Sequence, residues 1–481
     1  MAACSTTSTR SSASPSTTVF NAKSLPASPT HPTVDVSTTK FGPIPAGKGV
    51  PQASATVEHA GEGGPAPVLV ASYAESEELV SGTAATYSGP ATGPVTPQPG
   101  SSHFVTRILV RAPKDKRQFS GRVLVEPFNT SGGAELDALW QQVGPMLMSE
   151  GDAWVGVTER ASSVGHLQSY DPVRYAALDV PTNDVAWDIL RQVGRVLKDN
   201  LPTSPLRGLD VTHLYMGGYS QSALDTATFA MAFQPRTGTA HRTPVYDGYL
   251  PAAHSGSVTP VQSGTAVVPT LESKPFAPVD VPVIDIETQT DVEGFAIGSV
   301  FTSTSGASVR RHDSNLPADR YRLYEIPGAP HASTIDGCDG RPSSFPTEMF
   351  LRAAFKSLTQ WEERSTTPPS APRIELAVDD AVAVSKLDDF GNALGGVRSP
   401  FVDVPLYRYD VHSETGPLCK LAGHETPISA ANLEAKYGSA ARYRKQFTAS
   451  LDQTIKAGFL RVEDRSELLQ LGTSGLAAKF S

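Results

Sequence analysis

The sequence predicts an α/β fold built on a mostly parallel, doubly wound sheet. Short apolar runs alternate with helix-like segments along residues 60–365, and such alternation is typical of parallel strands joined by helices. Some of the runs, including residues 121–127 and 153–158, are almost continuously apolar, as strands covered on both faces are. Polar residues follow several runs, at the strand ends where open parallel sheets bind their ligands.

The strands can be placed in order from their apolar residues and the turn signals between them. Residues 104–111 alternate apolar and polar side chains, which predicts a strand with one face in water. Pro282 should lie near the start of its strand, where the missing N–H is tolerated. The predicted strands are residues 68–71, 78–80, 104–111, 121–127, 153–158, 211–217, 244–250, 281–288 and 321–327, with a turn at Ser81 and Gly82.

The helices are predicted from apolar residues spaced three and four apart. They are residues 134–147, 182–197, 223–232 and 345–363. Residues 161–181 have few apolar repeats, and residues 251–279 form an insertion rich in Pro, Ser and Val. Long connections near a site are usually lids or pocket walls, so both segments are expected to border a pocket.

Composition excludes several classes of protein. The 481 residues carry a net charge of -9, with 19% charged residues and no basic run, so nucleic acid is not an expected partner. No stretch approaches the ~20 apolar residues that span a bilayer. Cys4, Cys338 and Cys419 are too few for a disulfide framework or a zinc site. They leave open either a single bridge from Cys338 to Cys419 or reduced thiols.

The first 45 residues predict a disordered tail. Ser, Thr, Pro and Ala dominate them, and no acidic residue precedes Asp35. Such a segment cannot bury enough apolar surface to become ordered. It contains no apolar core of a secretory signal, and the sequence leaves the compartment open between the cytoplasm and the cell exterior.

The stretch 213–223 reads as a strand, a sharp turn and a helix. Such a turn would lift Ser220 clear of the sheet and leave the N–H of Gln221 facing the same space. Small neighbours are needed because strand and helix come together there; Gly218 meets this need, and Ser222 stands where the usual pattern has glycine. The pattern alone is weak, since an ordinary capping serine would also fit.

A Gly-rich loop follows the predicted strand 121–127. Residues 129–133 read Asn-Thr-Ser-Gly-Gly, at the place from which a second oxyanion donor comes when a turn like that at Ser220 carries the nucleophile. No Lys-[ST] follows the glycines, as a nucleotide-binding loop requires. Asn129, Thr130 and Gln221 are therefore predicted as the oxyanion hole, and a merely tight turn is the alternative.

A carboxylate and a histidine follow later strands. Asp291 lies just past the predicted strand 281–288, and His331, alone among 11 histidines, follows a strand after that acid. A serine hydroxyl needs an imidazole to remove its proton, and the imidazole needs a carboxylate to fix its tautomer. Ser220, Asp291 and His331 are thus the predicted catalytic residues. Glu287, Glu293 and Asp285 remain alternatives for the acid.

Residues 374–475 are too apolar for a tail and are predicted to pack on the core. Residues 374–378 and 402–406 read as strands, and residues 431–437, 443–455 and 466–471 as helices. Asp388 and Asp389 lie near Gly391-Asn392 and the glycine pair Gly395-Gly396, which suggests a metal or nucleotide loop. The favoured interpretation is a turn-rich wall, because no strand, loop and helix with phosphate spacing surrounds them.

These motifs together carry a family resemblance. The chain resembles the α/β-hydrolase superfamily and, within it, the group called alpha/beta hydrolase domain-containing proteins, over roughly residues 60–475. That group is similar in having Ser-Gln-Ser at 220–222, and its members resemble carboxylic ester hydrolases. The segments that carry the resemblance are residues 77–84, 106–113, 121–133, 151–157, 171–175, 220–222, 247–248 and 391–398.

The resulting hypothesis is a serine hydrolase of small-molecule carboxylic esters, on an α/β-hydrolase fold with a C-terminal extension packed on the core. It would form an acyl-enzyme and require neither cofactor nor metal. The alternatives are an acyltransferase with the same residues and a non-catalytic binding protein on the same fold. The complete set of Ser220, Asp291 and His331 in the expected order argues against the last. Oligomeric state, and the acyl and alcohol parts of the substrate, are left open.

Overall fold

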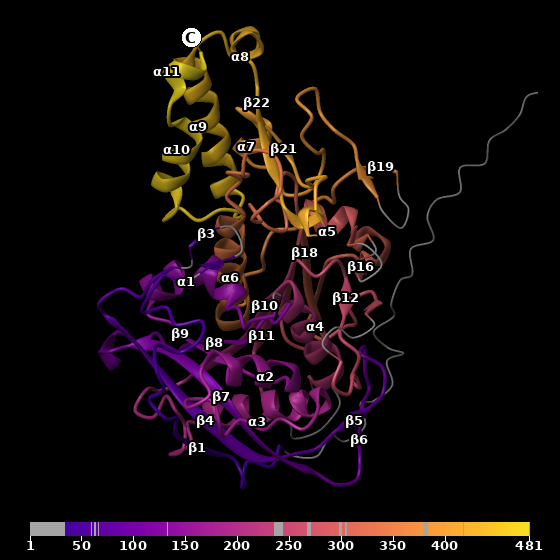
Figure 1. Cartoon of the computed structure of the whole chain (residues 1–481). Helices are drawn as coiled ribbons and strands as arrows, with labels where there is room; N and C mark the ends of the chain where they lie inside the picture. The colour runs from indigo at the N-terminus through magenta and orange to yellow at the C-terminus, as the bar shows by residue number, and fades with distance from the viewer. Residues whose placement is uncertain are drawn as a thin grey trace, which may run out of the picture.

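A ten-stranded mixed sheet forms the centre of the molecule, with strand order β1-β4-β7-β9-β8-β10-β11-β14-β18-β17 (Figure 1). The structure is a computed structural model. It describes residues 34–480 apart from 59, 62–63, 66, 132, 235–243, 267–270, 298–300, 304, 379–382 and 417.

Six neighbouring strands of this sheet are parallel, as the sequence predicts. They are β9 (Ala153–Val157), β8 (Arg122–Pro127), β10 (His213–Tyr219), β11 (Gly248–Ala252), β14 (Val283–Thr288) and β18 (Asp319–Ile326). Because they run in the same direction, their carboxyl ends meet at one edge. Every predicted site residue lies shortly after the carboxyl end of one of these strands.

Antiparallel strands extend the sheet at both ends. They are β1 (Lys40–Pro43), β4 (Tyr73–Ala84) and β7 (Ser102–Pro113) at one end and β17 (Ser314–Leu316) at the other. The predicted turn at Ser81 and Gly82 is wrong, because these residues continue β4 and pair with Val105 and Phe104. Residues 68–71 form no strand.

The predicted tail of residues 1–45 lies mostly outside the described residues. Its last part does not, because Lys40–Pro43 pairs with β4 at the edge of the sheet. Backbone hydrogen bonds to the edge of the sheet hold this segment, together with the packing of Val34 and Phe41 against an apolar cluster.

Helices cover both faces of the sheet. α1 (Ala138–Glu150) and α6 (Thr347–Arg364) share one apolar cluster, while α3 (Ala186–Lys198) and α4 (Gln221–Phe233) share another. Alternation along β8 divides its side chains between the two, with Leu124 in the first cluster and its neighbours Val123 and Val125 in the second. The sheet is therefore buried on both sides, as its apolar strands predict. The prediction that residues 104–111 leave one face in water is wrong, because the polar side chains Thr106, Arg107 and Arg111 on β7 are buried as well.

The two predicted long connections contain regular structure of their own. The first includes α2 (Ala161–Tyr170), and the second includes β12 (Ser257–Val258) paired with β13 (Glu272–Ser273). The remaining short elements before residue 320 are β2 (Ala60–Gly61), β3 (Gly64–Pro65), β5 (Tyr87–Ser88), β6 (Thr96–Pro97), η2 (Lys116–Gln118), η3 (Asn183–Val185), α5 (Gln289–Glu293), β15 (Phe295–Ile297), β16 (Phe301–Ser303) and η4 (Gly306–Val309).

The C-terminal extension packs against the α1 and α6 side of the core. Its helices gather beyond α6, at the end of the molecule away from β1 and β4 (Figure 1). Phe401 meets Phe447 edge to face at 5.3 Å within the apolar cluster that also holds α6. Its elements are β19 (Leu376–Val378), β20 (Val384–Ser385), α7 (Pro400–Asp403), β21 (Tyr407–Asp410), η5 (Cys419–Leu421), β22 (His424–Pro427), α8 (Ala430–Tyr437), α9 (Ala440–Lys456), α10 (Arg465–Thr473) and α11 (Leu476–Lys479).

One element of the extension is predicted wrongly. Residues 402–406 were expected to be a strand, but α7 occupies their first part. Pro400 is at the start of that helix, where its fixed φ and missing N–H suit the first turn. Among the described residues, no helix has the length and apolar character needed to cross a bilayer.

Candidate active site

Ser220 lies at the sharp turn between β10 and α4. Its φ is positive, at 59°, with ψ -126°, a conformation that residues other than glycine rarely adopt. Two residues earlier there is no room for a side chain, since a Cβ on Gly218 would lie 2.4 Å from the backbone of Ser222. The turn therefore has the geometry of a nucleophile elbow, with Ser220 half-buried at its apex.

Ser222 has a structural reason for standing where the usual pattern has glycine. Its hydroxyl accepts a hydrogen bond from Tyr219 N at 3.0 Å and donates one to Tyr219 O at 3.1 Å. Both Tyr219 groups lie at the end of β10, where the strand stops pairing in order to turn. The Ser222 hydroxyl thus satisfies two backbone groups of the turn that a glycine could not reach.

The three predicted catalytic side chains lie in one hydrogen-bonded line. His331 Nε2 is 2.9 Å from Ser220 Oγ. On the other side of the ring, His331 Nδ1 is 3.0 Å from Asp291 Oδ1 and 3.1 Å from Oδ2. A carboxylate on Nδ1 fixes the tautomer that leaves Nε2 free to accept a proton from the serine.

Two hydroxyl groups complete the surroundings of Asp291. Thr288 Oγ1 donates to Asp291 Oδ2 at 2.5 Å, and Ser255 Oγ donates to Oδ1 at 3.0 Å. Burial acts to raise the pKa of Asp291, but the charge of His331 and the hydrogen bonds from His331, Thr288 and Ser255 outweigh it. The pKa of this buried carboxyl is therefore held below its ordinary value, and the group stays ionised.

The other carboxylates considered for the acid have different partners. Glu287 accepts three backbone N–H groups, from His254, Ser255 and Gly256. Asp285, in the middle of β14, accepts from Tyr321 Oη and lies 3.0 Å from His254 Nε2. None of these contacts involves His331.

Glu293, the remaining alternative, faces the C-terminal extension. It lies 3.1 Å from His412 Nε2 and accepts from Ser385 Oγ at 2.6 Å. Asp291 is the one of these four carboxylates that contacts His331, because α5 begins directly after β14 and directs the Asp291 side chain toward the imidazole. The sequence carried a signal for this helix, since Thr288 three residues before Asp291 forms its N-cap.

The loop after β8 contacts the elbow, but the N–H groups of Asn129 and Thr130 already donate to other atoms of the protein. Asn129 N donates to Leu136 O at 3.0 Å. Its N–H is therefore not free to bind an oxyanion, and the prediction that it does so is wrong. Asn129 Nδ2 instead donates to Tyr219 O at 3.0 Å and ties the loop to the end of β10. Thr130 N donates to the side-chain Oε1 of Gln221 at 2.8 Å.

Gln221 therefore has two parts with different roles. It is the first residue of α4, so its backbone N–H has no acceptor within the helix and lies beside Ser220. Its side chain bridges Thr130 to Asp225, donating through Nε2 to Asp225 Oδ2 at 3.1 Å. The sequence predicts that this loop lies beside Gln221 as part of one oxyanion hole, but no local pattern indicates that the Gln221 side chain joins the two.

A buried ion pair anchors that bridge. Arg160, just after β9, pairs with Asp225 through two guanidinium nitrogens. Glu159 lies 3.4 Å from Arg160 Nε. Burial, followed by the charge of Asp225, raises the pKa of Glu159 well above its usual range.

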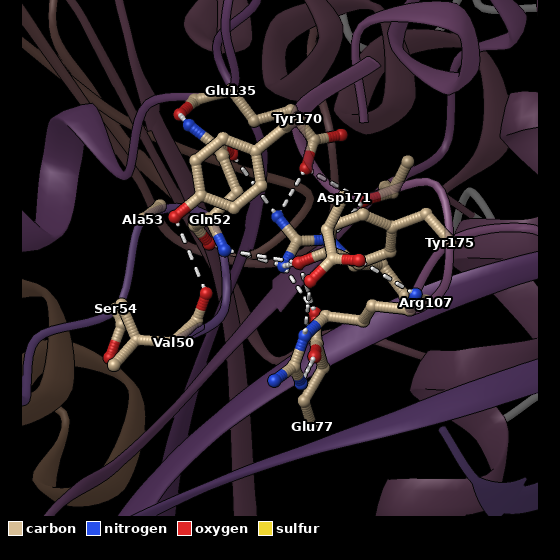
Figure 2. Close-up of polar contacts among 12 residues, drawn as sticks. Val50, Gln52, Ala53, Ser54, Glu77, Arg107, Glu135, Tyr170, Asp171 and Tyr175 are labelled. Atoms are coloured by element: carbon tan, nitrogen blue, oxygen red, sulfur yellow. Dashed lines mark hydrogen bonds and ion pairs between the residues drawn. The ribbon is translucent and has the colours of Figure 1, made fainter. Parts of the chain in front are cut away.

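A second buried arginine supports the same loop from the sheet. Figure 2 shows Arg107, on β7, reaching Glu77 and Glu135, each at 2.6 Å. Glu135 follows the Gly-rich loop, and its backbone oxygen accepts from Gln52 Nε2 at 2.6 Å. Breaking a buried pair of this kind leaves an uncompensated charge, so Arg107 fixes the position of the loop.

The C-terminal extension contacts the segments that carry the acid and the histidine. Thr290 Oγ1 donates to Val411 O at 2.8 Å, next to Asp291. Ala332, next to His331, donates to Leu421 O and accepts from Gly423 N. A disulfide between Cys338 and Cys419 joins the same two regions. The bridge that the sequence left open is present.

The described residues give no support to the suggested metal or nucleotide loop at Asp388. Its carboxylate accepts from the N–H groups of Phe390 and Asn392 and pairs with Arg398, which closes a turn. Groups with metal-ligating atoms close together occur elsewhere in the described part of the chain, at His254, Asp285 and Glu287 and at His213, Glu362 and Glu363. Each of these histidines is already hydrogen-bonded or ion-paired with a carboxylate.

Solved structures with a similar arrangement include two hydrolase-like proteins. One is a protein assigned as a dienelactone hydrolase from Klebsiella pneumoniae subsp. pneumoniae, with 13% identity, 60% of this chain and 99% of that chain covered, and a TM-score of 0.31. The other is an alpha-beta serine hydrolase homologue from Coxiella burnetii, with 11% identity, 38% and 69% covered, and a TM-score of 0.24. At these values they add nothing to the functional argument.

The family comparison is more informative. No curated protein matches the chain. The model of the alpha/beta hydrolase domain matches residues 40–470, which includes every strand of the central sheet and most of the C-terminal extension. With the parallel sheet and the elbow at Ser220, this match shows that the chain belongs to the alpha/beta hydrolase domain family.

Proposed function

We propose that this hydrolase cleaves carboxylic esters of small molecules through Ser220, His331 and Asp291. The observation that carries the proposal is the unbroken line of hydrogen bonds from Ser220 Oγ through His331 to Asp291. These bonds join Ser220 to His331, 111 residues apart in the sequence, and His331 to Asp291, 40 residues apart. Such a line is what a serine needs to become a nucleophile near neutral pH.

The reaction follows from the positions of these atoms. His331 Nε2 takes the proton from Ser220 Oγ as the oxygen attacks the acyl carbon, and Asp291 stabilises the resulting imidazolium. His331 then gives that proton to the leaving alcohol, which produces an acyl-enzyme on Ser220. Water attacks the acyl-enzyme by the same route, with His331 again as base, and releases the acid.

The oxyanion is assigned to two N–H groups near Ser220. Gln221 N–H is the first donor, because the residue after the nucleophile begins α4. Thr130 N–H is the second, with its present acceptor, Gln221 Oε1, giving way to the substrate oxygen. Asn129 acts through its side chain, which holds the loop against β10.

The proposal is tested by covalent labelling and by turnover. A fluorophosphonate probe should add to Ser220, and wild-type protein should hydrolyse p-nitrophenyl esters, with the rate changing along a series of acyl lengths. Ser220→Ala should abolish both labelling and turnover. Ser466→Ala, at an exposed position of α10, is the matched control and should change neither.

Other outcomes would redirect or reject the proposal. Labelling that persists in Ser220→Ala would show that another residue is the nucleophile. If added alcohols compete with water and new esters accumulate, the same residues serve acyl transfer. A wild-type protein that neither labels nor hydrolyses any ester of the series would leave a binding protein on this fold.

A further inference from the structure

The turn that follows β11 has an unusual backbone. Ala253, Ser255 and Gly256 have φ values of 58°, 54° and 61°. Only the last is a glycine, and the left-handed region is unfavourable for the other two. Strained backbone of this kind persists only where surrounding contacts hold it, and such positions cluster at functional sites.

Glu287 is the group that holds this turn. One carboxylate oxygen accepts from His254 N and Ser255 N at 3.1 and 3.0 Å, and the other accepts from Gly256 N at 3.0 Å. All of these groups are buried or nearly so. Three consecutive N–H groups that converge on one carboxyl group form a nest, which favours this backbone shape.

The side chain of His254 fixes the turn from a second direction. Its Nδ1 lies 2.9 Å from Ser257 O, and its Nε2 lies 3.0 Å from Asp285 Oδ1. Asp285 is itself held by Tyr321 Oη at 2.7 Å. Glu287 and Asp285 both belong to β14, so the turn is fastened to the same strand that leads into Asp291.

The held turn presents one side chain to the proposed active site. Ser255 Oγ donates to Asp291 Oδ1 at 3.0 Å, the same oxygen that lies 3.0 Å from His331 Nδ1. The backbone of η4 closes the space on the far side, since a Cβ on Gly306 would lie 3.0 Å from Asp291 O and 3.2 Å from Ser255 C. Ser255 therefore has little freedom to move away from the carboxylate.

We propose that Ser255 is a positioning residue for Asp291, delivered by the strained turn that Glu287 and His254 hold in place. Thr288 bonds the other oxygen of Asp291, so the two hydroxyls fix the rotation of the carboxylate about its own axis. That rotation sets how Asp291 meets His331 Nδ1. The inference rests on the proposed function, because it concerns the acid of the same catalytic line.

The inference is tested with two substitutions that remove the hydroxyl. Ser255→Ala keeps the side chain small at the same φ, while Ser255→Gly also relieves the unfavourable backbone. Since a hydrogen bond to a charged group is lost, kcat should fall about 10- to 100-fold in both variants, with KM unchanged within about threefold. Ser305→Ala is the matched control, because its buried hydroxyl donates to Val292 O and not to Asp291.

Crystal structures of the variants give a readout that does not depend on turnover. The Asp291 carboxylate should rotate in Ser255→Ala and Ser255→Gly and keep its orientation in Ser305→Ala. If the wild type hydrolyses esters and both Ser255 variants keep its kcat, the inference is overturned while the proposed function stands. If the wild type hydrolyses no ester, the proposed function fails, and the role of Ser255 is judged from the Asp291 carboxylate alone. A rotated carboxylate in the Ser255 variants supports that role, and an unchanged one refutes it.

Discussion

Replacing the disulfide tests how firmly the C-terminal extension is joined to the segment after His331. The change is Cys338→Ser with Cys419→Ser, and Cys4→Ser is the control because Cys4 takes no part in the bridge. The double variant should unfold at a lower temperature. Its activity below that temperature should stay within a few-fold of the wild type.

The expected size follows from the length of chain that the bridge closes. The two cysteines are 81 residues apart, and a loop of that length lowers the entropy of the unfolded chain by an amount worth about 4.5 kcal/mol at 25 °C. A chain of this length has an unfolding entropy of about 1 kcal/mol/K. The unfolding temperature should therefore fall by about 4.5 °C.

Activity should survive because other contacts hold the same segments together. Ala332 exchanges backbone hydrogen bonds with Leu421 and Gly423, and these remain in the double variant. The measurements are calorimetry with and without reductant, and initial rates at 25 °C. A thiol count on the unfolded, unreduced wild type should find only Cys4 reactive.

The reasoning is refuted by either of two results. If the double variant unfolds at the wild-type temperature, the bridge does not restrict the unfolded chain as supposed. If it keeps its stability but loses turnover, the disulfide acts on the geometry of His331 and not on the unfolded state. Cys4→Ser should behave as the wild type in both assays.

Two further predictions concern the acid and the base. Asp291→Asn should reduce kcat by roughly 10⁴-fold, by analogy with the same change in other catalytic triads. Glu287→Gln should reduce kcat far less, because Glu287 accepts hydrogen bonds from backbone N–H groups. Steady-state kinetics on one ester would show the reverse order if Glu287 were the acid. The pH dependence should report the imidazole: the pKa of Asp291 is held below its ordinary value, so that carboxylate stays charged as the pH falls, while an ordinary imidazole gains its proton near 6.5. The value of kcat/KM should therefore fall as pH drops through roughly 6 to 7, and a profile that stays flat to pH 4 would contradict a histidine base.

The parallel sheet, and the edge at which the candidate site lies, could be predicted because both depend on local sequence patterns. Apolar runs mark β8, β9 and β14, and the glycines before Ser220 mark the turn that follows β10. The order of Ser220, Asp291 and His331 along the chain is itself informative once the strands are placed. These features need no knowledge of which segments meet in space.

The rest depended on long-range contacts that no local pattern records. Ser255 contacts Asp291 across 36 residues, from a turn whose N–H groups donate to Glu287. Thr130 N–H is engaged by Gln221 Oε1, 91 residues away, and β4 continues through Ser81 and Gly82 because β7 pairs with it. In each case tertiary pairing, and not residue preference, decides the outcome.

The contacts of the extension also bear on the order of events during synthesis. A nascent chain that has emerged only as far as α6 already contains Ser220, Asp291 and His331. It lacks Val411 and His412, which bind α5, and Leu421, which binds the residue after His331. The segments that carry the proposed acid and base thus gain their final contacts only when the extension leaves the ribosome. If these residues catalyse hydrolysis as proposed, activity should appear late in translation and not with the completed sheet.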